Sequence, residues 1–229
     1  MSNFITLGYD GLSTPVDVKM EKTLNEIFLR QYEYIFSGDE SEVFQRFNES
    51  KEGFSSAIKS LFLSAIFAGS YYAFDLIRTE VPGFSKDPTE DLIRAYNIHI
   101  QESINKMFDT TYRRLQILME QGFSAAQAGY VVSVIGNRPS VINEYENVYL
   151  FNQGIVVVLK TSGFVDFVRW VTAQDESVCP TCRPLNGVIM PLLSATTPPI
   201  HWGCRCKLAF IVDKRKSRLE GLQGTSNSF

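Results

Sequence analysis

The sequence is poor in proline, histidine and cysteine, and these residues are unevenly placed. Its 229 residues include 9 prolines, 2 histidines and 4 cysteines. Pro82, Pro88 and Pro139 are the only prolines between residues 17 and 160, which leaves room for long helices because proline interrupts a helix. The cysteines, in contrast, all lie in the short segment from Cys179 to Cys206. The sequence therefore predicts a largely helical chain with its distinctive chemistry near the C-terminus.

The sequence lacks the patterns typical of disordered, membrane-spanning and secreted proteins and of several enzyme classes. Hydrophobic residues make up 45% of the chain and charged residues 21%, which excludes a wholly disordered or collagen-like protein. The uncharged, mainly apolar run Ser60–Phe74 has 15 residues, short of the roughly 20 that a membrane-spanning helix needs. The N-terminus carries no basic run followed by an apolar segment, so we expect no secretory signal and a reducing compartment.

Gly-rich phosphate loops, serine nucleophile elbows and HExxH helices are also missing, so we expect no enzymatic activity.

Charge is distributed asymmetrically along the chain. The formal net charge is -3, with 13 basic and 20 acidic residues in positions 1–154, but 9 basic and 5 acidic residues in positions 155–229. The acidic balance argues against a protein coated with positive charge for nucleic acid. The basic C-terminal end nevertheless favours a contact with DNA or a protein partner, with a solvated terminus as the alternative. The residues concerned are Lys207, Lys214, Arg215, Lys216 and Arg218.

Helical periodicity dominates the chain from Val16 to Lys160. The expected helices run from Val16 to Phe36, from Glu40 to Arg78 with a break near Gly53, from Asp87 to Gly122, from Ser124 to Ile135, and from Ser140 to about Lys160. The third of these has the clearest apolar stripe, which we expect to form core or an oligomer interface. Its members are Ile93, Ile100, Ile104, Met107, Thr111, Leu115 and Leu118. His99 lies among polar neighbours, without an evident partner.

The pattern changes after residue 162. The segments 164–172, 188–190 and 206–212 are rich in β-branched, aromatic and other apolar residues and are separated by Pro, Gly and Asn, which predicts a small sheet. We therefore expect an α+β protein: a mainly helical body with a small Cys-rich, β-containing C-terminal module. The predicted divisions are a body at 1–161, a module at 162–213 and a basic, flexible tail at 214–229.

The cysteine cluster has the spacing of a structural metal site. Two thiolates separated by two residues can hold one side of a tetrahedral ion, and a second pair farther along the chain can close it. We expect zinc at four of five candidates, and we favour a set with His201 and one of the last two cysteines. The alternatives are a disulfide and ordinary buried thiols. The five candidates are Cys179, Cys182, His201, Cys204 and Cys206.

The same residues carry a family resemblance. The run from Trp170 to Gly187, which contains Asp175, Glu176 and the first cysteine pair, and the run Pro198 to Cys206 resemble the signature of tailed-phage minor head proteins of the Mu F type. The match is close over these two runs, while Arg138, Ile142, Glu146, Asn152 and Gly154 fit the family's upstream pattern more loosely. The chain departs from the family at Asn186, where relatives often have Asp, and at Trp202-Gly203, where they often have Asn-Pro.

This resemblance implies a structural virion protein bound at the portal vertex inside the head. Its partners would be the portal protein, other capsid or scaffold proteins and phage DNA, with assembly, DNA packaging or DNA ejection as its role. It would reside in the host cytoplasm during assembly and in the virion afterwards, in an oligomer with the portal. Two alternatives remain: a zinc-stabilised nucleic-acid-binding module, and a zinc-dependent hydrolase that uses Asp175 and Glu176 as acid and base.

Overall fold

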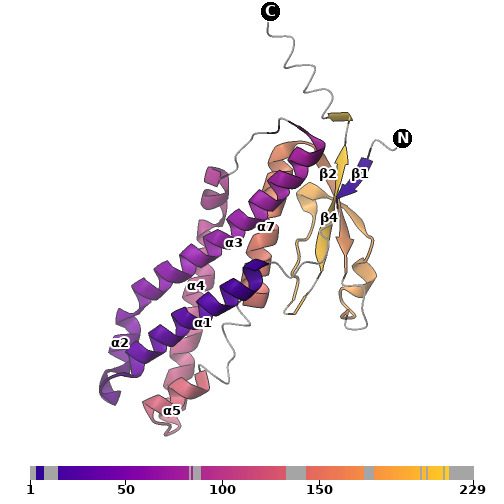
Figure 1. Cartoon of the computed structure of the whole chain (residues 1–229). Helices are drawn as coiled ribbons and strands as arrows, with labels where there is room; N and C mark the ends of the chain where they lie inside the picture. Colours follow the sequence, from indigo (N-terminus) through magenta and orange to yellow (C-terminus); the bar gives the residue numbers. More distant parts are fainter. Residues whose placement is uncertain are drawn as a thin grey trace, which may run out of the picture. The chain divides into compact units, whose positions relative to one another are not determined.

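The protein is a mainly helical chain with a small antiparallel sheet, which confirms the α+β expectation (Figure 1). The computed structural model describes residues 4–7, 15–82, 84, 89–132, 143–172, 178–201, 203–204, 206–213 and 215–216. The helices are α1 (Pro15–Phe36), α2 (Val43–Glu49), α3 (Lys51–Glu80), α4 (Thr89–Glu120), α5 (Ala125–Tyr130) and α7 (Val148–Ser162). The strands are β1 (Phe4–Leu7), β2 (Val165–Val171), β3 (Ile189–Pro191) and β4 (Lys207–Asp213).

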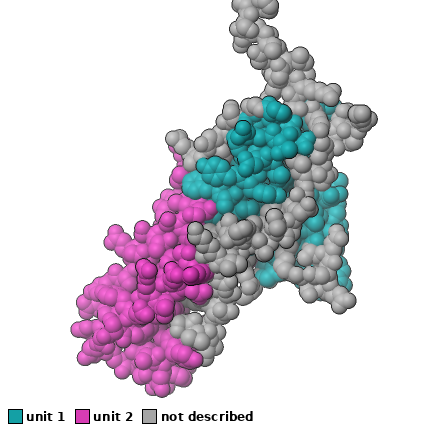
Figure 2. Space-filling view, in the orientation of Figure 1, with its two compact units in different colours: residues 1–13, 65–92, 147–229 teal, residues 14–64, 93–146 magenta. Residues whose placement is uncertain are grey.

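The chain divides into two compact units (Figure 2). Unit 1 contains residues 1–13, 65–92 and 147–229, and unit 2 contains residues 14–64 and 93–146. This division differs from the boundary expected near residue 162, because α7 and the second half of α3 share a hydrophobic core with the sheet. The Cys-rich module is therefore one part of a larger unit that includes helices.

Most predicted helix positions agree with the structure, and one predicted break is displaced. The break in the second helical stretch falls at Ser50 and not at Gly53. The Ser50 hydroxyl donates to the Phe47 carbonyl oxygen at 2.8 Å and accepts from the Gln31 side chain at 3.2 Å, and such bonds compete with helix continuation. Ser124 caps α5 as predicted, in a reciprocal capping box with Gln127. The predicted turn 136–140 and the predicted cap at Asp87 and Pro88 lie outside the described residues.

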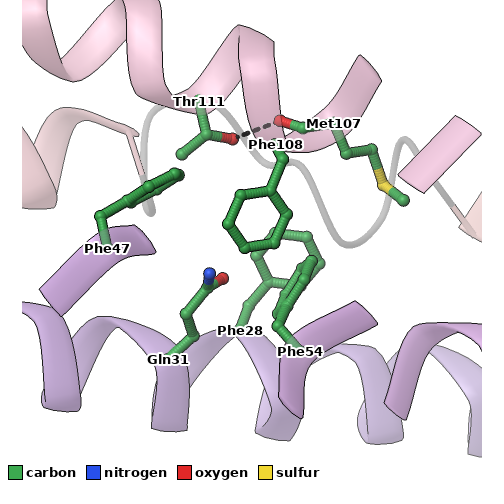
Figure 3. A pocket seen from close by; sticks show the side chains of 7 residues that line it. All are labelled: Phe28, Gln31, Phe47, Phe54, Met107, Phe108 and Thr111. Atoms are coloured by element: carbon green, nitrogen blue, oxygen red, sulfur yellow. Dashed lines mark hydrogen bonds between the residues drawn. The ribbon is translucent and has the colours of Figure 1, made fainter. Parts of the chain in front are cut away.

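Unit 2 has an aromatic core to which α4 contributes its predicted stripe. Ile100, Ile104 and Leu115 are fully buried, whereas Ile93 is 40% exposed. The buried part of the stripe therefore begins at Ile100, about two turns later than expected. A small gap beside this stripe is too narrow to admit a water molecule, and the Thr111 hydroxyl bonds the Met107 carbonyl at its edge (Figure 3). We conclude that this gap is a packing feature and not a ligand site. It is lined by Phe28, Gln31, Phe47, Phe54, Met107, Phe108 and Thr111.

The sheet of unit 1 has the order β1-β4-β2-β3, and all neighbouring strands are antiparallel. Three strands match the predicted segments, whereas β1 was not predicted. It comes from the other end of the chain and pairs Phe4 with Asp213 and Leu7 with Phe210. In the central pair, Trp170 lies opposite Leu208 and Val168 opposite Phe210. Because side chains alternate along a strand, these four residues share one face of the sheet.

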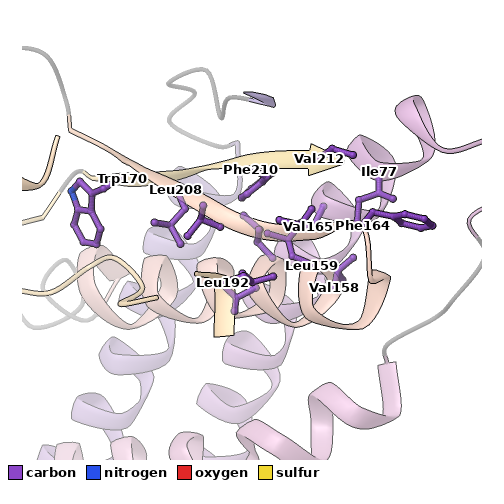
Figure 4. Packing of buried hydrophobic residues seen from close by; sticks show 14 of the residues in the cluster. Ile77, Val158, Leu159, Phe164, Val165, Trp170, Leu192, Leu208, Phe210 and Val212 are labelled. Atoms are coloured by element: carbon purple, nitrogen blue, oxygen red, sulfur yellow. The ribbon is translucent and has the colours of Figure 1, made fainter. Parts of the chain in front are cut away.

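That face packs against α7 and the second half of α3. Trp170, Phe164 and Phe210 are almost completely buried there (Figure 4). The two helices approach each other closely at two glycines, where a Cβ on Gly69 would overlap the carbonyl group of Phe151 and a Cβ on Gly154 would overlap that of Ile66. This close approach fixes α7, and with it the start of the sheet.

By length and hydropathy α3 is also the one described helix that could cross a membrane. Core helices of globular proteins share these properties. The sequence predicts a buried helix, and its residues Ile58, Phe62 and Ala65 are fully buried.

Candidate metal centre

The first cysteine pair lies in a tight turn fastened to the end of β2. The turn is closed by bonds from the backbone N–H groups of Cys182 and Arg183 to the Cys179 carbonyl, at 3.1 and 3.0 Å. The Asn186 side chain accepts a bond from the Thr172 N–H at 3.1 Å. Asn186, one of the departures from the family pattern, therefore helps to hold the turn against the sheet.

Two antiparallel bonds complete this attachment. The Gly187 N–H donates to the Trp170 carbonyl at 2.8 Å, and the Trp170 N–H donates to the Val188 carbonyl at 2.9 Å. Gly187 has a φ of 80°, a conformation that residues with a Cβ adopt only with strain. The local sequence Asn-Gly thus positions both cysteines beside the inner face of the sheet.

The second ligand segment is held by α7 and by β4. Asn152 on α7 donates to the Pro198 carbonyl at 3.1 Å, three residues before His201. The Cys204 N–H then donates to the His201 carbonyl at 3.2 Å, which forms a turn. Cys206 directly precedes β4. These contacts bring the loop between β3 and β4 over the first cysteine pair.

The structure brings all five predicted candidates together. The Sγ atoms of Cys179 and Cys182 each lie 3.0 Å from the His201 Nε2. The Sγ atoms of Cys182 and Cys204 are 3.8 Å apart. The sulfur atoms of Cys182, Cys204 and Cys206 all lie within 4.8 Å of one another, so Cys182 belongs to both groups. All four cysteines are free thiols, and the expected disulfide alternative is not observed among them.

This cluster can hold a metal ion. With metal–sulfur bonds of about 2.3 Å and a metal–nitrogen bond of about 2.0 Å, a tetrahedral zinc places two sulfur ligands about 3.8 Å apart and sulfur and nitrogen about 3.5 Å apart. The separation of the Cys182 and Cys204 sulfur atoms matches the first value. The two observed sulfur–nitrogen distances, 3.0 Å each, are about 0.5 Å shorter than the sulfur–nitrogen separation around a tetrahedral zinc. The donor set therefore suits a tetrahedral ion with thiolate and imidazole ligands, and binding of the ion would lengthen the two sulfur–nitrogen distances by about 0.5 Å.

Local electrostatics favour a thiolate at Cys179. Burial raises the pKa of this thiol, but backbone hydrogen bonds from Cys182 and Thr181, together with the nearby His201, lower it to about 7. One of these bonds, from the Cys182 N–H to the Cys179 sulfur, is 3.3 Å long. Cys179 is thus partly ionised near neutral pH without a metal, which suits a thiol that must lose its proton to bind one.

The other sulfur atoms lie in a more apolar environment. Burial, followed by the neighbouring thiols, raises the pKa of Cys182. Burial also raises the pKa of Cys206, although Trp170 and Cys182 act in the opposite direction. Such buried thiols need a compensating cation if they are to ionise at neutral pH. A bound metal supplies that compensation.

Two of the predicted basic contact residues, Arg215 and Lys216, form ion pairs within unit 1. Arg215 makes a two-pronged contact with Asp213, with bonds of 3.0 and 2.8 Å, and Lys216 lies 2.7 Å from both carboxylate oxygens of Asp166. Lys207 is half-buried in β4. Lys214 and Arg218 lie outside the described residues, as do the candidate acid and base Asp175 and Glu176.

His99, for which the sequence indicates no partner, has one in the structure. Its Nε2 lies 3.3 Å from a carboxylate oxygen of Glu146, a residue 47 positions away. Two further residues near the metal candidates were not singled out as functional, namely Asn152 and Trp170. Trp170 opens one of the runs that resemble the Mu F type signature, and Asn152 belongs to the looser upstream pattern. The contacts of both residues depend on tertiary structure that spacing does not reveal.

The chain has no match among family models, curated proteins or solved structures.

Proposed function

We propose that this chain is a structural minor head protein of tailed phages, of the Mu F type, with a zinc ion that holds its sheet and loops together. The observation that carries the proposal is the convergence of four cysteines and one histidine in a signature that resembles that family. In a reducing compartment such a set is typical of a structural zinc. The ion would cross-link the turn after β2 to the loop before β4.

A structural role for the metal agrees with its surroundings. Cys182, Cys204 and Cys206 are each at most 5% exposed, and their sulfur atoms adjoin the hydrophobic core of unit 1. Catalytic zinc instead keeps one coordination position open to water and substrate. The burial of three thiols, with a further thiol and an imidazole beside them, favours a closed site.

Association with the portal and capsid would use the apolar surface of the helices. In unit 2, large hydrophobic side chains on three helices are exposed by 52% to 69%. Exposed apolar side chains mark protein contacts where they form a contiguous patch, and we propose these side chains as the contact residues. They are Leu29 on α1, Ile98 and Ile117 on α4, and Tyr130 on α5.

The proposal is tested by following the chain into phage particles. Particles assembled with the wild-type chain should contain it at the portal vertex in a cryo-EM map. The double variant Leu29→Ser and Ile117→Ser should reduce its incorporation, while Lys22→Ser, on the exposed surface of α1, serves as the control. A chain that is absent from purified heads would contradict the proposal.

A second test addresses the hydrolase alternative. The double variant Asp175→Asn and Glu176→Gln removes both candidate acid and base groups and preserves side-chain size. We expect particles that carry it to assemble and infect like the wild type. Lost infectivity with normally incorporated, metal-loaded protein would instead support catalysis.

A further inference from the structure

Trp170 is a buried polar group without a satisfactory partner. Its side chain is fully buried, and its indole N–H makes no hydrogen bond of acceptable geometry in the part of the chain that the structure describes. Buried donors are nearly always paired in native proteins, because water is no longer available to them. The unpaired Trp170 N–H lies in the same core as the candidate metal ligands. We therefore expect it to have a hydrogen-bond acceptor there that is stronger than a neutral thiol.

The register of the sheet identifies that acceptor. Trp170 on β2 lies opposite Leu208 on β4, and Cys206 comes two residues before Leu208. Since residues two apart share a strand face, Cys206 approaches Trp170 from the diagonal position. Trp170 and Cys206 are also both buried in the hydrophobic core of unit 1.

We propose that Trp170 is a positioning residue that selects Cys206 as the fourth metal ligand, by donating its indole N–H to the Cys206 thiolate. The other three ligands are Cys179, Cys182 and His201. Cys204 then remains a neutral thiol beside the site. This inference rests on the metal centre proposed above and resolves its surplus of five candidates for four positions.

The short distance between Cys182 and Cys204 does not conflict with this assignment. A separation of 3.8 Å is also that of two neutral sulfur atoms in ordinary contact. A thiolate bound to a metal, in contrast, stays negatively charged, and hydrogen bonds to charged acceptors are stronger than those to neutral ones. A thiolate at Cys206 would give the Trp170 N–H such an acceptor. Partners of this kind around a metal ligand commonly change metal affinity by about 10- to 100-fold.

The ligand assignment is tested with Co²⁺ bound to the full-length, reduced protein. The intensity of sulfur-to-cobalt charge-transfer absorption reports the number of bound thiolates. We expect Cys206→Ser to lower this intensity by about one third, because three thiolate ligands become two. The matched variant Cys204→Ser should retain the wild-type intensity. Loss of a thiolate in Cys204→Ser, with full intensity in Cys206→Ser, would overturn the assignment.

The role of Trp170 is tested with Trp170→Phe and with the wild-type protein. In Trp170→Phe, we expect Co²⁺ affinity to fall by about 10- to 100-fold. At saturating Co²⁺ the thiolate number should be unchanged, but the charge-transfer band should shift in energy. A purely structural role for the indole would leave that energy unchanged, and an unshifted band would overturn the proposal.

A measurement that needs no variant at position 170 covers the case in which Trp170→Phe fails to fold. The chain has 2 tryptophans, so ¹⁵N-labelled protein has two indole signals, and Trp202→Phe assigns them. With ¹¹³Cd bound, the Trp170 indole proton should show scalar coupling to the metal through the sulfur atom. Absence of this coupling in fully loaded protein would refute the hydrogen bond. If the wild-type protein binds neither Co²⁺ nor Cd²⁺, the proposal of a metal centre is wrong. If the protein binds these ions through a different fourth ligand, only the assignment of Cys206 is wrong.

Discussion

Replacement of Gly69 by alanine should strongly destabilise unit 1. Gly69 lies in α3, where an added Cβ would overlap the carbonyl oxygen of Phe151 on α7 and lie 2.8 Å from its carbonyl carbon. Ordinary contacts of a Cβ begin near 3.4 Å. The obstructing atoms are backbone atoms, so no side-chain rotation can relieve the overlap and the helices must separate.

The expected cost follows from this geometry. Overpacking of a well-packed core costs about 1–3 kcal/mol and occasionally more, and we expect Gly69→Ala to lie at the upper end. For a chain of this size, about 3 kcal/mol corresponds to a fall of roughly 6–12 °C in the melting temperature. The matched control is Gly53→Ala in the same helix, where nothing lies within 4 Å of the added Cβ. This change should be neutral or should stabilise its helix by about 0.5–1 kcal/mol.

Urea unfolding followed by tryptophan fluorescence is the appropriate assay. Trp170 and Trp202 both belong to unit 1, so the signal reports on the unit that Gly69 is expected to affect. If Gly69→Ala unfolds at the same urea concentration as the wild type, the close approach of α3 and α7 is not a constraint on this unit. The reasoning about its core would then be wrong.

Three further predictions concern single side chains. Leu115→Ala should cost about 2–5 kcal/mol because the residue is fully buried in α4, whereas Ile117→Ala, at a 52% exposed position of the same helix, should change the free energy of unfolding much less. Hydrogen bonds from Arg215 hold the pKa of the Asp213 carboxyl at about 2. Because an aspartate in the unfolded chain has a pKa of about 3.9, the ionised Asp213 carboxylate stabilises the fold fully above that pH, and this stabilisation is lost as the pH falls through about 2. NMR titration of the Asp213 carboxyl should show this low pKa, and Arg215→Ala should return it toward the ordinary value. Cys182→Ser removes the sulfur common to both ligand groups and should weaken metal binding more than Cys204→Ser does, as measured by competition with a chelator.

The helices and the candidate site could be predicted from the sequence to different extents. The α1 and α4 helices follow from local periodicity, turn signals and caps, which depend on residues near in sequence. The break at Ser50 was misplaced because it depends on Gln31, a partner 19 residues away. The β1 strand was missed because four residues carry little periodic signal and its partner strand lies at the opposite end of the chain.

For the candidate site, the spacing in the sequence was sufficient to predict the metal ligands but not the residues that position them. A Cys-x-x-Cys turn and a second cluster farther along the chain are patterns visible in the sequence, and the structure brings all five side chains together. The bond from Asn152 to Pro198 and the burial of Trp170 in the same core as the cysteines depend on how α7 and the sheet pack. No local pattern encodes such contacts, so these residues could be placed in the site only from the structure.

The metal content of the protein tests the central claim most directly. Full-length protein purified under reducing conditions should contain one zinc per chain by elemental analysis, and Cys182→Ser prepared in the same way should contain much less. Removal of the zinc with a chelator should expose Trp170 to solvent, seen as a red shift of tryptophan fluorescence, because metal binding and folding are coupled. A folded, fully reduced wild-type protein without stoichiometric metal would contradict the claim that these residues form a structural metal centre.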